Sequence, residues 1–291
     1  MYAMTGLTGQ VGGSLAEALV GAGAALCALV RDPARAAHWQ GQVRLVQGEI
    51  ADVAALAETL RGAEAAFVML PPAFDPQPDF PAAPTMIASV REALLAARPE
   101  RVVALSTIGA RAVQPNLLNQ LGLFEDALRD LPMPVAFLRA AWFMENAAWD
   151  VAPAREGRIT SFLQPVGRAI SMVSAGDVGR AAAALMRQEW RGLRVVELEG
   201  PAPVSPEAIA GTFAALLGHP VDVQEVPRDS WETLFRDQGM ANPLPRIQML
   251  DGFNQGWIAF GDPSAERMTG STTLAQALSG LLARSRASAG G

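Results

Sequence analysis

The sequence predicts an α/β fold built on a doubly wound parallel sheet, and three observations support this prediction. Short apolar runs alternate with segments of helical periodicity through the first half of the chain, which is the pattern of parallel strands joined by crossover helices. A glycine-rich turn at residues 5–13 follows the first apolar run and opens the first helical segment. The chain has 291 residues, 50% of them hydrophobic, so it can bury the large core that such a sheet requires.

The elements of the first half follow in order along the chain. Asp52 stands at the N-cap position of one of the predicted helices, where its carboxylate can accept a backbone N–H. The apolar runs predict strands at residues 3–5, 25–30, 43–46, 66–70, 102–106 and 135–138. Helical segments are predicted at residues 12–20, 33–39, 53–60, 85–97 and 117–131.

After Asn146 the alternation weakens, and the large apolar side chains of residues 228–262 lie in a polar background. We predict short strands at 158–162, 169–173 and 195–198, and helices at 178–187, 206–217 and 274–284, the first with Asp177 as its N-cap. Residues 1–150 therefore form the sheet domain and residues 151–291 a smaller, mostly helical lobe. Segments near 171–200 are expected to return to the sheet domain.

Composition excludes several classes of protein. The net charge is −6 and the 23 basic residues, all arginine, are scattered, so we expect neither a nucleic-acid partner nor an anionic membrane surface. The single cysteine, Cys27, and two unrelated histidines, His38 and His219, exclude a disulfide framework and a metal cluster. The longest weakly charged stretch, 18–30, is too short to span a bilayer, and no basic region marks a signal peptide. We expect a cytoplasmic protein.

The spacing of Gly6, Gly9 and Gly12 is typical of a dinucleotide site. The turn follows a strand and opens a helix, which is the context this motif requires. Without Cβ atoms, the backbone can approach a pyrophosphate at the helix N-terminus, where unpaired N–H groups favour negative charge. The alternative is a tight turn that serves helix packing only.

Arg31 closes the second predicted strand, at the position that distinguishes NADP from NAD. An arginine there can bind the 2′-phosphate of NADP, whereas an acidic side chain binds the ribose hydroxyls of NAD. Arg31 favours NADP, but Asp32 could face the ribose instead, so NAD stays an alternative cofactor. A solvated arginine with no ligand is the third interpretation.

Other candidate residues lie at the carboxyl ends of later strands, where open α/β sheets bind their ligands. Residues 71–84 contain six prolines, with Phe74 and Phe80 among them. This segment is either a semi-rigid flap over the nicotinamide or a stiff surface connection. Ser106 and Thr107 could polarise a substrate carbonyl, and Gln120 could supply an amide contact, but each of these side chains could equally cap a helix or turn. The catalytic residues stay unassigned.

Together, these motifs resemble the NmrA-like branch of the atypical short-chain dehydrogenase/reductase superfamily. The resemblance is based on residues 5–12 (TGLTGQVG), 30–33 (VRDP), 105–110 (LSTIGA) and 138–146 (LRAAWFMEN), with weaker matches at 174–179 and 197–201. It implies a Rossmann domain that binds NADP or NAD and a small C-terminal lobe that closes over the nicotinamide.

The resemblance also implies roles for individual residues. Arg31 would hold the 2′-phosphate, and Glu49 and Ile50 would flank the adenine. The residues that would hold the pyrophosphate are Thr5, Gly6, Thr8, Gly9, Gln10, Val11 and Gly12. Those that would line the nicotinamide are Leu70, Pro71, Pro72, Ser106, Thr107 and Ile108. The substrate would contact Phe74, Trp142, Phe143 and Asn146.

The chain departs from most of the superfamily in its catalytic pair. Leu117 and Leu121 occupy the positions of the usual Tyr-x-x-x-Lys motif, the chain contains no lysine, and its one tyrosine is Tyr2. We therefore predict an NAD(P)H-dependent oxidoreductase that reduces a quinone or another flat aromatic carbonyl compound without a Tyr-Lys pair.

Two alternatives to this prediction stay open. The first is a regulator that senses the dinucleotide without turnover and acts on a protein partner. The second is an enzyme that tailors aromatic polyketides. A homodimer is the default assembly for such a fold.

Overall fold

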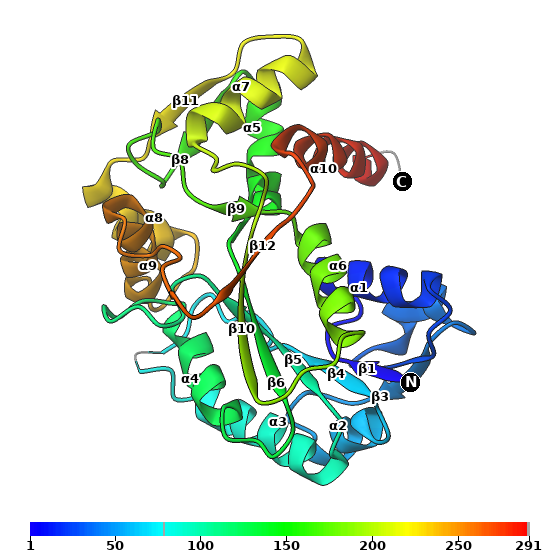
Figure 1. Cartoon of the computed structure of the whole chain (residues 1–291). Coiled ribbons are helices and arrows are strands. Elements are labelled where there is room, and N and C mark those ends of the chain that lie inside the picture. Colours follow the sequence, from blue (N-terminus) through cyan, green and yellow to red (C-terminus); the bar gives the residue numbers. More distant parts are fainter. Residues whose placement is uncertain (78, 290–291) are drawn as a thin grey trace.

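An eight-stranded, wholly parallel sheet forms the centre of the molecule, in the order β12-β10-β6-β5-β4-β1-β2-β3 (Figure 1). This computed structural model describes residues 1–77 and 79–289. The strands are β1 (Tyr2–Met4), β2 (Leu26–Val30), β3 (Arg44–Gln47), β4 (Ala65–Val68), β5 (Val102–Thr107), β6 (Val135–Ala140), β10 (Leu193–Glu199) and β12 (Glu266–Thr269). The predicted parallel α/β sheet is confirmed.

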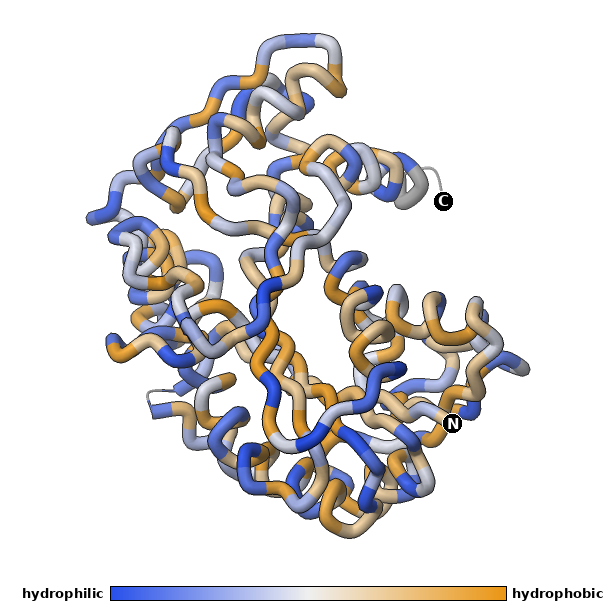
Figure 2. The backbone as a smooth tube through the Cα atoms, viewed as in Figure 1, coloured by the Kyte–Doolittle hydropathy of each residue, from blue (hydrophilic) through white to orange (hydrophobic). Residues whose placement is uncertain are grey.

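Helices cover both faces of the sheet. Helices α1 (Gln10–Gly21) and α6 (Ala175–Met186) pack side by side on one face, and α2 (Val53–Leu60), α3 (Ala83–Ala97) and α4 (Asn119–Leu128) cover the other (Figure 1). Successive strand residues enter opposite cores: Met4 and Ala28 pack under α1 and α6, whereas Ala3 and Cys27 pack under α2 and α3. Apolar residues accordingly run continuously along β2 and β4 in the interior of the sheet (Figure 2).

The C-terminal lobe has a core of its own, centred on Trp231, Phe235 and Phe213. Ile108 and Leu117 of the sheet domain belong to the same core, so the two parts are packed together. The lobe contains α5 (Val151–Arg155), β8 (Arg158–Ser161), α7 (Pro206–Leu217), β11 (Asp222–Glu225), α8 (Trp231–Asp237), α9 (Leu244–Gln255) and α10 (Leu274–Ala289). A short parallel pair, β7 (Trp142–Phe143) and β9 (Met172–Val173), lies where the chain leaves the sheet.

In the second half of the chain, the structure differs from the prediction in β12 and in the start of α6. Strand β12 was not predicted, because its residues are polar and it lies at the edge of the sheet. Helix α6 begins at Ala175, before the predicted start, and its cap is Ser174, whose Oγ accepts the Gly176 N–H at 3.2 Å. Asp177, predicted as the cap, instead bonds Arg180 and the N–H of Thr272. The segments predicted to return to the sheet domain contain α6 and β10.

The described helices include none with the length and apolar character needed to cross a membrane.

A glycine allows the close contact between α1 and α6. A Cβ on Gly179 of α6 would lie 2.5 Å from the Val11 carbonyl oxygen and 2.7 Å from the Leu15 nitrogen. Both atoms belong to the backbone of α1 and cannot rotate away. Gly211, on α7, has no atom within 4 Å of the same position.

We predict that Gly179→Ala lowers the free energy of unfolding by about 1–3 kcal/mol, because the two helices must move apart. The matched control, Gly211→Ala, should raise it by about 0.5–1 kcal/mol through helix propensity alone. Urea denaturation of the two variants measures both values. Equal effects would show that the α1–α6 contact does not require a glycine.

Candidate functional site

The three glycines of the first turn have different structural roles. Gly6 has a φ of +77°, which favours glycine, and forms the tight turn after β1. A Cβ on Gly12 would lie 2.0 Å from the Gly6 carbonyl oxygen, so Gly12 lets α1 pack against the turn. The nearest atom to a Cβ on Gly9 is the Gly6 oxygen at 3.4 Å, so the front of the turn is open.

The open front of the turn faces the N-terminus of α1. Gly9 is the N-cap and supplies no side-chain cap, so the first N–H groups of the helix keep the orphan character of a helix start. Thr8 and Gln10 are exposed beside it, whereas Val11 is buried and can contribute only its backbone N–H. A turn without side chains in front of a helix N-terminus fits the pyrophosphate of a dinucleotide.

Thr5, predicted as a cofactor contact, positions the turn. Its side chain is buried, and its Oγ1 accepts the Met69 N–H at 3.0 Å. The bond joins the end of β1 to the residue that follows β4, and the Met69 side chain packs against Gly6. Met69 was not predicted, because nothing in the sequence pairs it with the glycine turn.

Arg31, the predicted contact of the 2′-phosphate of NADP, directly follows β2. Strands β4, β1, β2 and β3 are neighbours in that order, so the residues that follow them gather at one edge of the sheet. Arg31 is exposed after β2, and Glu49 is exposed after β3. Asp32 instead caps the 3₁₀ helix η1 (Pro33–Trp39) by accepting the Ala34 N–H at 2.9 Å. This bond engages one of the two oxygens of the Asp32 carboxylate.

The proline-rich segment that follows β4 connects the two parts of the molecule. The Asp75 carboxylate accepts the N–H groups of Ala241 and Asn242 at 2.8 and 2.7 Å. Gln120 Nε2 donates to the Ala73 carbonyl at 3.3 Å and to the Leu117 carbonyl at 3.1 Å, so this amide nitrogen holds the segment. Phe74 is 65% exposed. Pro78, one of the six prolines, lies outside the described residues.

Ser106 takes part in a buried ionic network. Its Oγ donates to Glu125 Oε1 at 2.6 Å, and Glu125 is fully buried on α4. Arg139 of β6 binds both oxygens of the same carboxylate, at 2.8 and 2.7 Å, and also Asp262 at 3.1 Å. Burial alone would lower the pKa of Arg139, but its bonds to Glu125 and Asp262 raise it. With its hydroxyl committed to Glu125, Ser106 is not available to polarise a substrate carbonyl.

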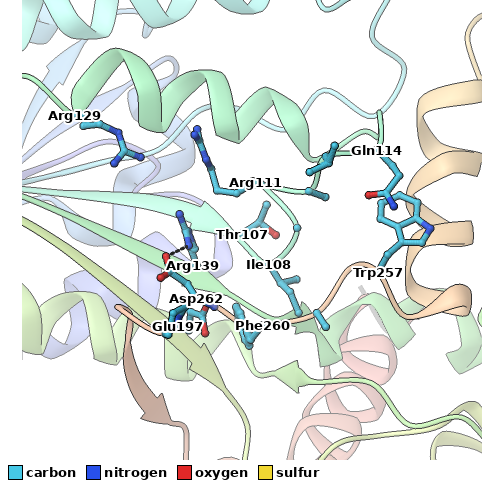
Figure 3. A pocket seen from close by; sticks show the side chains of 17 residues that line it. Thr107, Ile108, Arg111, Gln114, Arg129, Arg139, Glu197, Trp257, Phe260 and Asp262 are labelled. Carbon is cyan, nitrogen blue, oxygen red and sulfur yellow. Dashed lines mark hydrogen bonds and ion pairs between the residues drawn. The ribbon is translucent and has the colours of Figure 1, made fainter.

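A groove of about 540 Å³ lies between residues 107–114, at and after the end of β5, and residues 257–263 (Figure 3). Arg139 and Asp262 point toward each other across its floor, and Trp257 and Phe260 line its apolar part (Figure 3). Its lining includes Thr107 and Ile108 but neither the glycine turn nor Arg31, so the groove is separate from the predicted phosphate sites. Thr107 is half-buried, and its hydroxyl donates to the Ala140 carbonyl at 3.5 Å.

The residues predicted to contact the substrate follow β6. Trp142 packs edge-on against Phe253 of α9, with ring centroids 5.0 Å apart, and Phe143 packs against the core of the sheet domain. Asn146 is exposed. Leu117, in place of the usual tyrosine, is buried just before α4 and donates its N–H to the Pro245 carbonyl at 3.0 Å. These contacts bring α9 to the reactive end of the predicted site.

Comparison with known families identifies the class of cofactor. The sequence profile of a family described as NAD(P)H-binding matches residues 6–189, which is more than half of the chain. The chain belongs to this NAD(P)H-binding family. The prediction of a nicotinamide dinucleotide as cofactor is confirmed.

Two proteins similar to this chain in sequence are named as reductases. The chain is 27% identical to the (4-alkanoyl-5-oxo-2,5-dihydrofuran-3-yl)methyl phosphate reductase of Streptomyces griseus, over 80% of this chain and 79% of the relative. It is 24% identical to the NAD(P)H azoreductase of Xenophilus azovorans, over 84% and 83% of the two chains. The crystal structure of an NADPH-dependent quinone oxidoreductase from Escherichia coli, complexed with NADPH, matches with a TM-score of 0.77 and 24% identity, covering 97% and 99%.

We predict that Arg139→Met lowers the free energy of unfolding by about 3–5 kcal/mol, because it leaves the buried Glu125 carboxylate without its partner. The control is Arg194→Met, which removes a partly exposed ion pair with Glu266 and should cost about 1 kcal/mol or less. Urea denaturation distinguishes the two. The double variant Arg139→Met/Glu125→Leu should recover part of the loss, and a failure to recover would contradict the assignment.

We also predict that Arg31→Ala weakens NADP binding by about 1.5–3 kcal/mol, the contribution of a hydrogen bond to a charged group. NAD binding should change little, since NAD has no 2′-phosphate. Arg44→Ala serves as the control, because Arg44 begins β3, at the opposite end of the strands from Arg31, and pairs with Glu58. Calorimetric titration with both cofactors gives the values, and an equal loss for NAD and NADP would show that Arg31 is misassigned.

Proposed function

We propose that this protein is an NAD(P)H-dependent reductase that transfers a hydride to a quinone or another flat aromatic acceptor, with NADPH as the preferred cofactor. The observation that supports this proposal most strongly is an apolar pair, Leu117 and Leu121, in place of the tyrosine and lysine of related enzymes, in a chain that belongs to an NAD(P)H-binding family. Leu117 is buried, and Leu121 is half-buried on α4. Tyr2 lies at the start of β1, whereas the glycine turn follows the end of the same strand.

An acceptor for such a site must tolerate the absence of a strong protein acid. Bound dihydronicotinamide supplies the hydride. The acceptor gains the hydride at one position, and the resulting negative charge spreads over its conjugated oxygens. Water can then protonate this oxyanion to give the hydroquinone, so the protein has mainly to position the acceptor and exclude competing reactions.

The chain's own residues fit this role. The glycine turn and α1 hold the pyrophosphate, and the proline-rich segment closes onto the C-terminal lobe through Asp75. Trp142 and Phe143 offer flat apolar surface of the kind that aromatic acceptors contact. The names of the relatives point the same way, since they act on an azo compound, a quinone and an unsaturated furanone.

The residues proposed to bind the cofactor and the acceptor all come from one chain, so a second subunit is not required. The single buried cysteine suits a reducing compartment, and we place the enzyme in the cytoplasm.

Consumption of NADPH with a panel of naphthoquinones and azo dyes tests the proposal. We expect turnover with at least one acceptor. Gly9→Ala is the informative variant: its Cβ meets only the Gly6 oxygen at 3.4 Å, so the variant should fold normally, but the methyl group occupies the front of the turn. We expect NADPH binding and turnover to fall at least tenfold. Tight NADPH binding without turnover of any acceptor would instead identify a dinucleotide sensor.

A further inference from the structure

One arginine of the C-terminal lobe lacks the ionic partner that the other shielded arginines have. Among the arginines that the structure describes as buried or half-buried, Arg91, Arg101, Arg139 and Arg194 each form an ion pair with a carboxylate. Arg246 is half-buried, and no carboxylate of the described residues lies within ion-pair distance of it. Burial lowers the pKa of its guanidinium, and no neighbouring charge offsets that effect.

Apolar groups hold the Arg246 guanidinium in place. It lies 4.5 Å from the centre of the fully buried Phe235 ring, and its Nη1 is 3.6 Å from Met240 Sδ. Contact with the ring face restricts the guanidinium but satisfies few of its five N–H donors. A positioned guanidinium with open donors and reduced hydration is suited to bind an anion through paired hydrogen bonds.

Arg246 lies in the first turn of α9, next to the contact between α9 and the start of α4. It follows Pro245, whose carbonyl accepts the N–H of Leu117, the residue in the position of the missing catalytic tyrosine. Met240, on its other side, precedes the two backbone N–H groups that Asp75 binds. Arg246 therefore lies between the start of α4 and the segment that closes onto the lobe.

We propose that Arg246 binds an anionic substituent, such as a sulfonate, carboxylate or phosphate, on the aromatic acceptor. The inference rests on the proposed reductase function and specifies its substrate class. The net charge of the chain is −6, so the protein as a whole repels anions, and selectivity for an anionic acceptor has to come from a local cation. Arg246 supplies such a cation on α9, the helix whose Phe253 packs against Trp142 of the predicted substrate wall.

A pair of acceptors that differ by one charge tests the inference: a naphthoquinone and its sulfonated derivative. The variants are Arg246→Met, which keeps the apolar stem, and Arg246→Lys, which keeps the charge but loses the fork. Arg228→Met is the matched control, because Arg228 also stacks on an aromatic ring, that of Trp231, but pairs with Asp251. Comparing each variant with the wild type for both acceptors removes the difference in their reduction potentials.

We expect Arg246→Met to raise KM for the sulfonated quinone about tenfold or more, as loss of a charge-assisted bond does, with a much smaller change for the parent quinone. Arg246→Lys should lie between the wild type and the methionine variant, and Arg228→Met should leave the ratio of the two KM values unchanged. An equal change for both quinones in Arg246→Met would overturn the inference.

A second measurement separates this inference from the proposed function. If the wild type reduces neither quinone, the reductase proposal fails for these acceptors. Binding of the sulfonated quinone to the NADP-loaded protein, followed by quenching of tryptophan fluorescence, then decides the inference. Binding that weakens in Arg246→Met but not in Arg228→Met supports the anion site, whereas equal binding in all three proteins contradicts it.

Discussion

The bonds of one buried guanidinium, that of Arg139, join more parts of this molecule than any other polar contact described above. They connect β6 to α4 through Glu125 and to the segment before β12 through Asp262, and the Ser106 hydroxyl of β5 donates to the same Glu125 carboxylate. Burying these charges is costly unless every lone pair and donor finds a partner. The network therefore stabilises one relative position of strand, helix and returning chain. It holds the end of β5, and with it Thr107 and Ile108, where the nicotinamide side of the site is predicted.

The sequence predicted the sheet well where local and long-range forces agree. Helices 53–60 and 206–217 were predicted at their observed ends, because a polar cap precedes a clear apolar period in both. Strand β12 could not be predicted, since Glu266–Thr269 has no apolar alternation and owes its conformation to pairing with β10. Ser174 and Asp177 are both good caps, and only the contact of Asp177 with Thr272, far along the chain, excludes it from the capping role.

The candidate site shows the same division. Glycine spacing indicates a phosphate cradle, because the roles of the glycines are local to the turn. The Ser106 hydroxyl bonds Glu125 and the Gln120 amide bonds Ala73. No sequence pattern associates the residues of either pair. Arg246 looks like any other arginine in the sequence. Its interest arises from a missing partner, and a missing partner can be recognised only once its neighbours are placed.

The pairing of β10 has a consequence for the order in which the protein is made. On one side β10 pairs with β6, which precedes it in the chain, but its other edge pairs with β12, at residues 266–269 of 291. During synthesis this edge stays uncovered until nearly the whole chain has emerged. An uncovered strand edge is a template for pairing with other chains. The short polar strand β12, which the sequence does not predict, is thus the last strand to join the sheet. Truncation before β12 would leave the edge of β10 unpaired and prone to aggregation in an otherwise complete fold.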